Sequence, residues 1–178
     1  MKTKALFDAK RLIAQIVTDV VNLEDINYTV PEVQTLLDGI TVGGHKLQDE
    51  LITLNQIKAW RYFFVTIEDG TFSFDKNYVL RLHNLVANQE ALIWGEFRTG
   101  QVSISGTDYL PPKAAELNLL WDNLEQEINQ KLLCSQMLTI EIYRTAVLLF
   151  AKMARIQFFF DGNKRTARMM MSGVLLSC

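Results

Sequence analysis

The sequence predicts an all-α fold that carries one small β-hairpin. Helix breakers are sparse, with 9 glycines and 3 prolines among 178 residues. Apolar residues recur at helical spacing in most segments, and only the segment 92–112 alternates with period two. Hydrophobic residues make up 49% and charged residues 21%, which excludes intrinsic disorder. The length suits a single domain over residues 1–178.

Four helical patterns precede the period-two segment. The first has its apolar residues at helical spacing, and the second opens with Pro31, which is favoured in the first turn of a helix. The third is rich in aromatic residues, and the fourth is expected to begin at a Ser73 or Asp75 cap. The predicted ranges are 5–21, 31–37, 47–67 and, after the cap, up to about 89. The first two form an N-terminal part over about residues 1–45.

The segment 92–112 differs from the rest of the chain. Val102 and Ile104 alternate with polar neighbours between glycines, which is typical of a short strand or hairpin. Three more helices are predicted after it, from Pro111–Pro112 to about 133, over 139–157 and over 163–178. The pattern at 139–157 is apolar almost all round, which predicts a buried central helix.

Charge and titratable residues exclude several classes of protein. Lys and Arg number 18 against 20 Asp and Glu, a net charge of -2, which argues against a nucleic-acid partner bound by bulk positive charge. The two cysteines and two histidines are too scattered for a zinc finger or a disulfide framework. Charges interrupt the most apolar stretch, so no membrane span is expected. We expect a cytoplasmic protein, and the sequence leaves open whether copies form a homo-oligomer.

The stretch 157–168 carries the residues that point to chemistry. A Gly162–Asn163 turn separates two predicted helices, and a helix start attracts anions because its backbone N–H groups are unpaired. Three cations and one carboxylate stand at this start: Lys164, Arg165, Arg168 and Asp161. The cations oppose the helix dipole, and an anion between them would turn that repulsion into attraction. The pattern predicts a di- or triphosphate with Mg²⁺, and a helix start with solvated charges is the alternative.

The same stretch resembles the signature of the Fic family (Fic/Doc superfamily), H-x-F-x-D/E-G-N-G/K-R-x-x-R. It matches every specified position except the first: Phe159, Asp161, Gly162, Asn163, Lys164, Arg165 and Arg168. The segment 95–112 resembles the family's flap hairpin and its Pro-containing turn. The resemblance covers roughly residues 30–178, and the family's final helix would follow Cys178. It implies an all-α, Fic-type helical bundle with a small β-hairpin flap.

The resemblance also implies an activity, the transfer of AMP from ATP to a hydroxyl side chain of a target protein. By position, Asp161 would hold Mg²⁺ against the α- and β-phosphates. The remaining nucleotide contacts would come from an anion hole at Gly162 and Asn163, from Arg165 at the central phosphates and from Arg168 at the γ-phosphate, with Lys164 beside them.

The departure from the signature falls on its catalytic position. Gln157 stands where the family has the histidine that removes the proton from the attacking hydroxyl. A carboxamide has no comparable basicity, and loss of a general base typically costs about 10²–10⁴ in rate. Either the chain is a weak or inactive transferase that still binds nucleotide, or another base serves. The sequence does not place His45 and His83, and a polar helix-end residue with backbone contacts is the alternative role of Gln157.

Two further features resemble parts of the family. The run 34–39 resembles an inhibitory helix, S/T-x-x-x-E-G/N, whose glutamate pairs with the second motif arginine; here Asp38 replaces that glutamate, and a short helix ending in an Asp-Gly turn is the alternative. The flap, about 95–106, would add a segment of the target protein as an extra strand, while Val102 and Ile104 fit core contacts equally well.

Three functions are therefore open. In the first, the chain is a protein adenylyltransferase that binds ATP and Mg²⁺ and transfers AMP at a reduced rate. In the second, it is an inactive interaction module that senses a nucleotide. In the third, it transfers another phosphate-containing group such as UMP. Labelled ATP with the Gln157→His variant separates the first two.

Overall fold

Helices form all of the regular structure in the residues that the computed structural model describes, 2–132 and 139–177. In chain order they are α1 (Lys2–Arg11), α2 (Ile13–Asn22), α3 (Val30–Leu37), α4 (Leu47–Glu68), α5 (Lys76–Val86), α6 (Leu117–Leu132), α7 (Thr139–Ile156) and α8 (Asn163–Ser177), with a 3₁₀ turn at Ala114–Glu116. The prediction of an all-α fold is confirmed.

Local sequence signals set several helix starts. α3 begins after Thr29, where Glu32 accepts a hydrogen bond from the Thr29 backbone N–H at 2.8 Å, a capping box. α5 begins after Asp75, whose carboxylate accepts from the Tyr78 backbone N–H at 2.7 Å. Asp75 is thus the cap, and Ser73 instead donates to Asp75.

The predicted helix over 5–21 is in fact two helices. α1 and α2 meet at Leu12, whose φ of -94° and ψ of 11° interrupt the helical backbone. Leu12 is exposed, whereas Val17 and Val20 of α2 are buried. The apolar spacing runs through the junction unchanged, so periodicity alone does not reveal the break.

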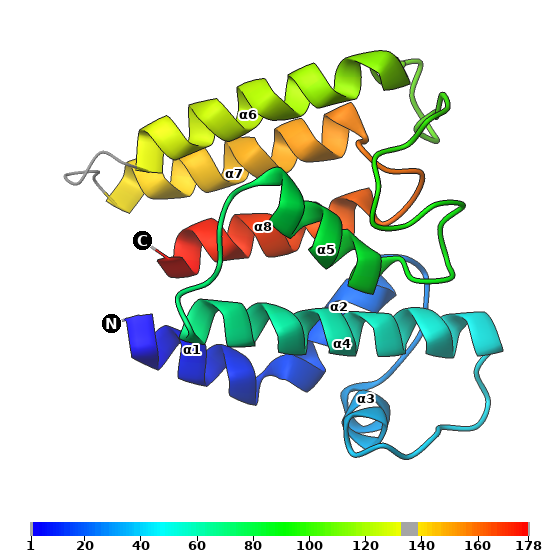
Figure 1. Cartoon of the computed structure of the whole chain (residues 1–178). Coiled ribbons are helices and arrows are strands. Elements are labelled where there is room, and N and C mark those ends of the chain that lie inside the picture. Colours follow the sequence, from blue (N-terminus) through cyan, green and yellow to red (C-terminus); the bar gives the residue numbers. More distant parts are fainter. Residues whose placement is uncertain (1, 133–138, 178) are drawn as a thin grey trace.

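The centre of the fold is α4, which packs against α1, α2, α3, α5 and α8 (Figure 1). Its aromatic side chains Trp60, Phe63 and Phe64 are 0–4% exposed. The prediction that 139–157 is the buried central helix is wrong. α7 packs on α6 and α8 but leaves a row of large apolar side chains 51–57% exposed: Ile140, Tyr143, Val147 and Leu148.

The predicted β-hairpin flap is also wrong, because the described residues contain no strand. Residues 101–104 are non-helical, and Val102 and Ile104 are half-buried while their polar neighbours are exposed. A hairpin needs a returning strand with backbone donors, and the return here reaches Pro111 and Pro112, which lack an N–H. A side chain holds the return instead, since Gln101 Nε2 donates to the Pro111 carbonyl at 2.8 Å.

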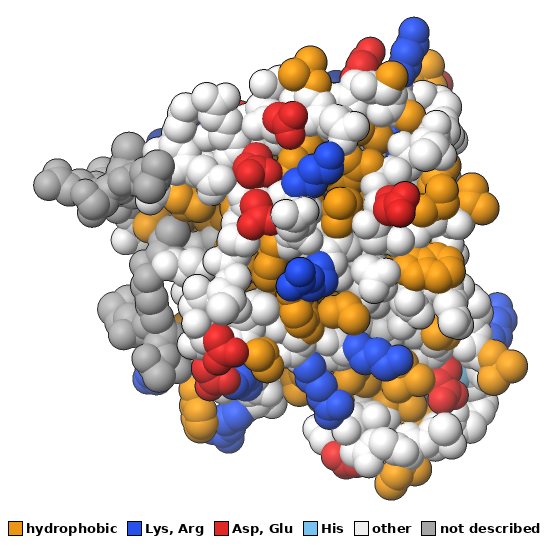
Figure 2. Space-filling model, in the orientation of Figure 1, with side chains coloured by type: hydrophobic (Ala, Val, Ile, Leu, Met, Phe, Trp, Pro, Cys, Tyr) orange, Lys and Arg blue, Asp and Glu red, His pale blue; other side chains and the backbone are white. Residues whose placement is uncertain are grey.

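The segment after α5 and the loop between α7 and α8 lie together at one end of the bundle, on the right in Figure 1. The Arg98 backbone N–H donates to the Phe158 carbonyl at 2.9 Å and joins the two. On the face shown in Figure 2, basic and acidic side chains are interspersed with apolar ones. Among the described helices, none is both long and apolar enough to cross a membrane.

Candidate functional site

The loop 157–162 reverses the chain between α7 and α8. Two residues take left-handed backbone conformations there, Gln157 with φ 55° and Gly162 with φ 69°. Asn163 fastens the turn: its Oδ1 accepts from the Phe159 N–H at 2.9 Å, and its Nδ2 donates to the Phe159 carbonyl at 2.8 Å. The amide that was expected in the anion hole is therefore used to hold the loop closed.

Gln157, at the position of the family histidine, has both ends of its carboxamide occupied. Its Nε2 donates to the Ala154 carbonyl at 2.6 Å, and its Oε1 accepts from Asn163 Nδ2 at 2.9 Å. These contacts match the alternative role, that of a polar residue at a helix end. The side chain has no basic atom to offer a hydroxyl.

His83 lies directly beneath the motif loop, a position that the sequence did not predict. Its ring is fully buried and stacks on Phe159 with centroids 3.7 Å apart. Nδ1 accepts from the Gly95 N–H at 3.0 Å, so Nε2 carries the proton and donates to the Asp161 carbonyl at 3.0 Å. Burial, opposed by the Asp161 carbonyl, lowers the pKa of His83 to about 4. With both nitrogens engaged in hydrogen bonds, His83 holds the loop and has no free ring nitrogen. The other histidine, His45, stacks on Tyr28 and contacts Glu32.

Arg98 ties the segment after α5 to the start of the motif. It is 2% exposed, and its guanidinium donates to the carbonyls of Gln157 at 2.6 Å, Gly100 at 2.7 Å and Pro112 at 2.6 Å. A cation at the end of α7 also interacts favourably with the helix dipole. Burial lowers the pKa of the Arg98 guanidinium from its ordinary value.

Arg165, expected at the central phosphates, is held by carboxylates. Its Nη1 donates to Glu90 Oε2 at 2.8 Å, its Nη2 donates to Glu90 Oε1, and Nη2 lies 3.3 Å from Asp161 Oδ1. Both partners of the Arg165–Glu90 pair are buried. Burial acts to lower the pKa of Arg165, but Glu90 with Asp161 and Glu24 outweighs it and raises that pKa. Among the donors of Arg165, Nε is buried and has no partner in the described residues.

Arg168, expected at the γ-phosphate, is the least compensated cation of the motif. Its Nη1 is buried and has no hydrogen-bond partner among the described residues. An unpaired buried donor costs about 1–3 kcal/mol. Burial lowers the pKa of Arg168; the charge of Glu24 opposes this shift and that of Arg165 adds to it. Lys164 is exposed and lies 4.0 Å from Glu24.

A small hollow of about 70 Å³ opens at this loop, lined by Glu24, Gln157, Phe160, Asp161, Gly162, Asn163 and Lys164. Pockets for small molecules measure about 300–1,000 Å³, so this hollow does not admit a whole nucleotide as it stands. One wall is Glu24, from the turn after α2. Asp38, expected to be inhibitory, lies elsewhere: it is exposed after α3, and its carboxylate accepts from Gln34 at 3.1 Å.

The fit of a metal ion rests on Asp161. Its side chain is 57% exposed, and Oδ1 accepts from the Gly162 N–H at 2.5 Å and faces Arg165. Oδ2 has no partner among the described residues, which is compatible with the single carboxylate that Mg²⁺ takes beside substrate phosphates. No group of three His, Cys, Asp or Glu in the described part of the chain forms a separate metal site.

Sequence reasoning missed His83, Arg98, Glu90 and Glu24. A weak signal existed only for Glu24. Residues 20–25 place a glutamate at the fifth position of S/T-x-x-x-E-G/N, and Asp25, with φ 60°, takes the left-handed conformation at the G/N position. The other three are distant in sequence from the motif, and only the packing of α5 and the following segment brings them to it.

Two curated relatives match most of this chain in sequence. "Protein adenylyltransferase Fic" of Aedes aegypti is 26% identical over 149 residues, which are 83% of this chain and 28% of that protein. The Drosophila melanogaster protein of the same name is 27% identical over 158 residues, 88% of this chain and 31% of that one. The chain thus spans less than a third of the length of these relatives.

Solved structures share the fold. A Fic-domain-containing signaling protein from Bacteroides thetaiotaomicron matches with a TM-score of 0.79 at 19% identity, over 99% of this chain and 66% of that one. Fic-1 from C. elegans matches with a TM-score of 0.73 at 16% identity, over 98% and 59%. Residues 73–175, more than half of the chain, match the family described as Fic/DOC. The protein belongs to the Fic/DOC family.

Proposed function

We propose that residues 1–178 form a single Fic domain that binds ATP with a divalent metal ion at the start of α8 and transfers AMP to a hydroxyl side chain of a target protein. The observation that carries the proposal is the tight turn at Gly162, which brings the first turn of α8 and its three cations to one corner of the fold. Helix starts with added cations bind phosphate groups. The curated relatives named for this activity support it.

Each motif residue has a role in this proposal. Asp161 would hold Mg²⁺, which neutralises phosphate charge when bound. The first backbone N–H groups of α8 and Lys164 would face the phosphates, while Arg168 would pair with the terminal one. The charge of Arg165 would attract the phosphates, and Glu90 would hold the plane of the Arg165 guanidinium in place.

Gln157 makes the proposed transfer slow. No imidazole replaces it, because His83 uses both nitrogens within the protein. Proximity and phosphate binding would remain, and loss of the general base alone typically costs about 10²–10⁴ in rate.

We assign the proposed brake to Glu24 rather than to Asp38. Glu24 lines the hollow at the motif, lies 4.0 Å from Lys164 and acts electrostatically on Arg165 and Arg168. Its carboxylate stands where an incoming phosphate would need room and positive charge. Removing it would widen the hollow and free the cations.

We further propose that the target protein lies along residues 101–104. This segment is non-helical and carries exposed polar residues between Val102 and Ile104. Its backbone would pair with an extended peptide without the hairpin that the sequence predicted.

The decisive experiment compares four proteins with labelled ATP and Mg²⁺: wild type, Gln157→His, Glu24→Ala and the double variant. We expect little label on the wild type and the most on the double variant. Asp38→Ala serves as the matched control and is expected to behave as wild type. Absence of label on the double variant, with a target or on the chain itself, contradicts AMP transfer.

A nucleotide-sensing module without catalysis is the second candidate, favoured by the occupied carboxamide of Gln157. Both proposals require that the chain binds ATP, and calorimetry measures that binding. We expect Glu24→Ala to bind ATP·Mg²⁺ more tightly than wild type, and addition of Arg168→Ala to weaken that binding by about tenfold or more. ATP bound by a double variant that gains no label supports the sensor.

A further inference from the structure

A second cavity is lined by Arg168, the last arginine of the motif. It is a groove of about 430 Å³ between α1 and α2 on one side and α4 and α8 on the other. Its walls are mainly apolar and include Ile16, Val20, Leu23, Trp60, Phe64 and Leu175. This volume falls within the range of small-molecule sites, unlike the hollow at Asp161.

The polar side chains that line the groove differ in whether they have hydrogen-bond partners. Arg168 lines it with a half-buried guanidinium whose Nη1 has no partner among the described residues. Trp60, 4% exposed, lines it too, and its Nε1 is likewise buried without a partner in the described part of the chain. Asp19 is exposed and already accepts from Gln15 at 2.8 Å. The groove therefore has the Arg168 cation, which forms no ion pair with the described residues, and the exposed carboxylate of Asp19 beside apolar walls.

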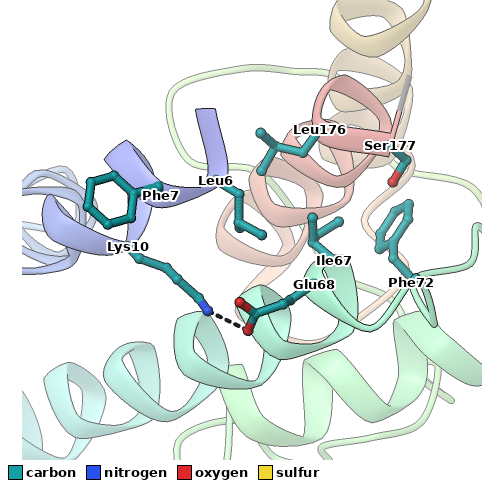
Figure 3. A pocket seen from close by; sticks show the side chains of 9 residues that line it. Leu6, Phe7, Lys10, Ile67, Glu68, Phe72, Leu176 and Ser177 are labelled. Carbon is teal, nitrogen blue, oxygen red and sulfur yellow. Dashed lines mark hydrogen bonds and ion pairs between the residues drawn. The ribbon is translucent and has the colours of Figure 1, made fainter. Parts of the chain in front are cut away.

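A neighbouring cavity differs from this groove in that its charged side chains are paired. It measures about 590 Å³ and lies between α1, the end of α4 and the end of α8 (Figure 3). Its two charged side chains, Lys10 and Glu68, bond to each other at 2.5 Å. Because the two charged side chains of that larger cavity pair with each other, neither is left to bind a charged ligand.

We propose that the groove beside Arg168 binds an amphiphilic carboxylate, such as a medium-chain fatty acid, with its carboxylate on Arg168 and its alkyl chain along Val20, Phe64 and Leu175. The carboxylate pairs with the charge of the half-buried Arg168 guanidinium, and a charge-assisted hydrogen bond is the strong form of that contact. The apolar walls favour an alkyl chain because its burial removes apolar surface from water. A simple inorganic anion would leave those walls without a partner.

The test is calorimetric titration of the whole chain, without nucleotide, with decanoate and with 1-decanol. We expect decanoate to bind with a dissociation constant below about 1 mM and 1-decanol to bind about tenfold or more weakly, since it lacks the charge. Arg168→Gln is expected to reduce the difference between the two ligands to less than about threefold.

A second variant tests the walls without touching the cation. Ala9 of α1 is half-buried and lines the groove, so Ala9→Phe is expected to fill it and to weaken decanoate binding by about tenfold or more. Ala151→Phe, at an exposed alanine of α7, is the matched control and should leave the affinity unchanged. If Arg168→Gln does not fold, as judged by circular dichroism, the 1-decanol comparison and Ala9→Phe decide.

Two results overturn the proposal. One is the absence of decanoate binding to the wild type, and the other is decanoate binding that Ala9→Phe leaves unchanged. Neither bears on ATP binding at the motif, which is measured in a separate titration. Loss of the proposed nucleotide function would likewise leave this groove and its test intact.

Discussion

Single buried polar residues hold the motif loop in place. Asn163 closes the turn, Arg98 binds three carbonyl groups around its start, and His83 supports it from below. Buried polar groups are stable only when they are hydrogen-bonded, and each of these side chains binds backbone groups of the loop or its neighbours. The loop's shape is therefore set before any ligand arrives.

The buried imidazole of His83 makes stability depend on pH. Its pKa is about 4 in the folded protein and about 6.5 when unfolded, so the unfolded chain binds more protons between these values. This stabilisation is complete above pH 6.5 and is lost as the pH falls toward 4, on the order of 3 kcal/mol in total. Urea unfolding at several pH values, for wild type and His83→Gln, measures it.

The variant His83→Gln cannot take up the proton, so its free energy of unfolding should fall less steeply over the same pH range. Comparing slopes removes the contributions of carboxylates, which both proteins share. Equal slopes for the two proteins would show that folding does not lower the pKa of His83.

At the scale of elements, the start of α8 depends on one glycine. Gly162 has φ 69°, and a Cβ atom there would lie 3.3 Å from side-chain atoms of Ala87 and Val86. A left-handed conformation costs a residue with a Cβ roughly 1–2 kcal/mol, and the close approach adds to that cost. We expect Gly162→Ala to lower the free energy of unfolding by about 2 kcal/mol or more, measured by chemical denaturation.

Gly39→Ala is the matched control for that substitution. Gly39 has φ 82°, and nothing lies within 4 Å of the place where its Cβ would stand. It therefore bears the backbone strain without the crowding. An equal loss for Gly39→Ala and Gly162→Ala would mean that α5 and the motif loop are not closely packed.

At the scale of the whole molecule, α4 is the central helix, packed against α1, α2, α3, α5 and α8. Phe63, in the C-terminal third of α4, is 0% exposed and contacts the rings of Trp60, Phe64 and Phe72. Phe63→Ala is expected to cost about 3–5 kcal/mol in the free energy of unfolding, through lost burial and the cavity left behind.

Val65 lies two residues further along α4 and is 50% exposed. Val65→Ala should change the free energy of unfolding by no more than about 0.5 kcal/mol. Similar losses for Phe63→Ala and Val65→Ala in thermal or urea unfolding would contradict a central position for α4.

The sequence by itself determined the all-α class, most helix ranges and the motif over 157–168, because these depend on neighbours within one or two turns. The caps at Thr29 and Asp75 and the turn at Gly162 are local in the same sense. A resemblance in those residues was enough to indicate the family.

Only the tertiary structure decided which residues surround the motif. Glu90, His83 and Arg98 reach it from other segments, and Glu24, not Asp38, faces its cations. Periodicity also could not predict two further features: the absence of a hairpin among the described residues of the segment 95–106, and the exposure of α7. An apolar pattern shows which side chains avoid water, but it does not show which neighbouring element covers them. Contacts between distant segments come from the packing of all the helices at once.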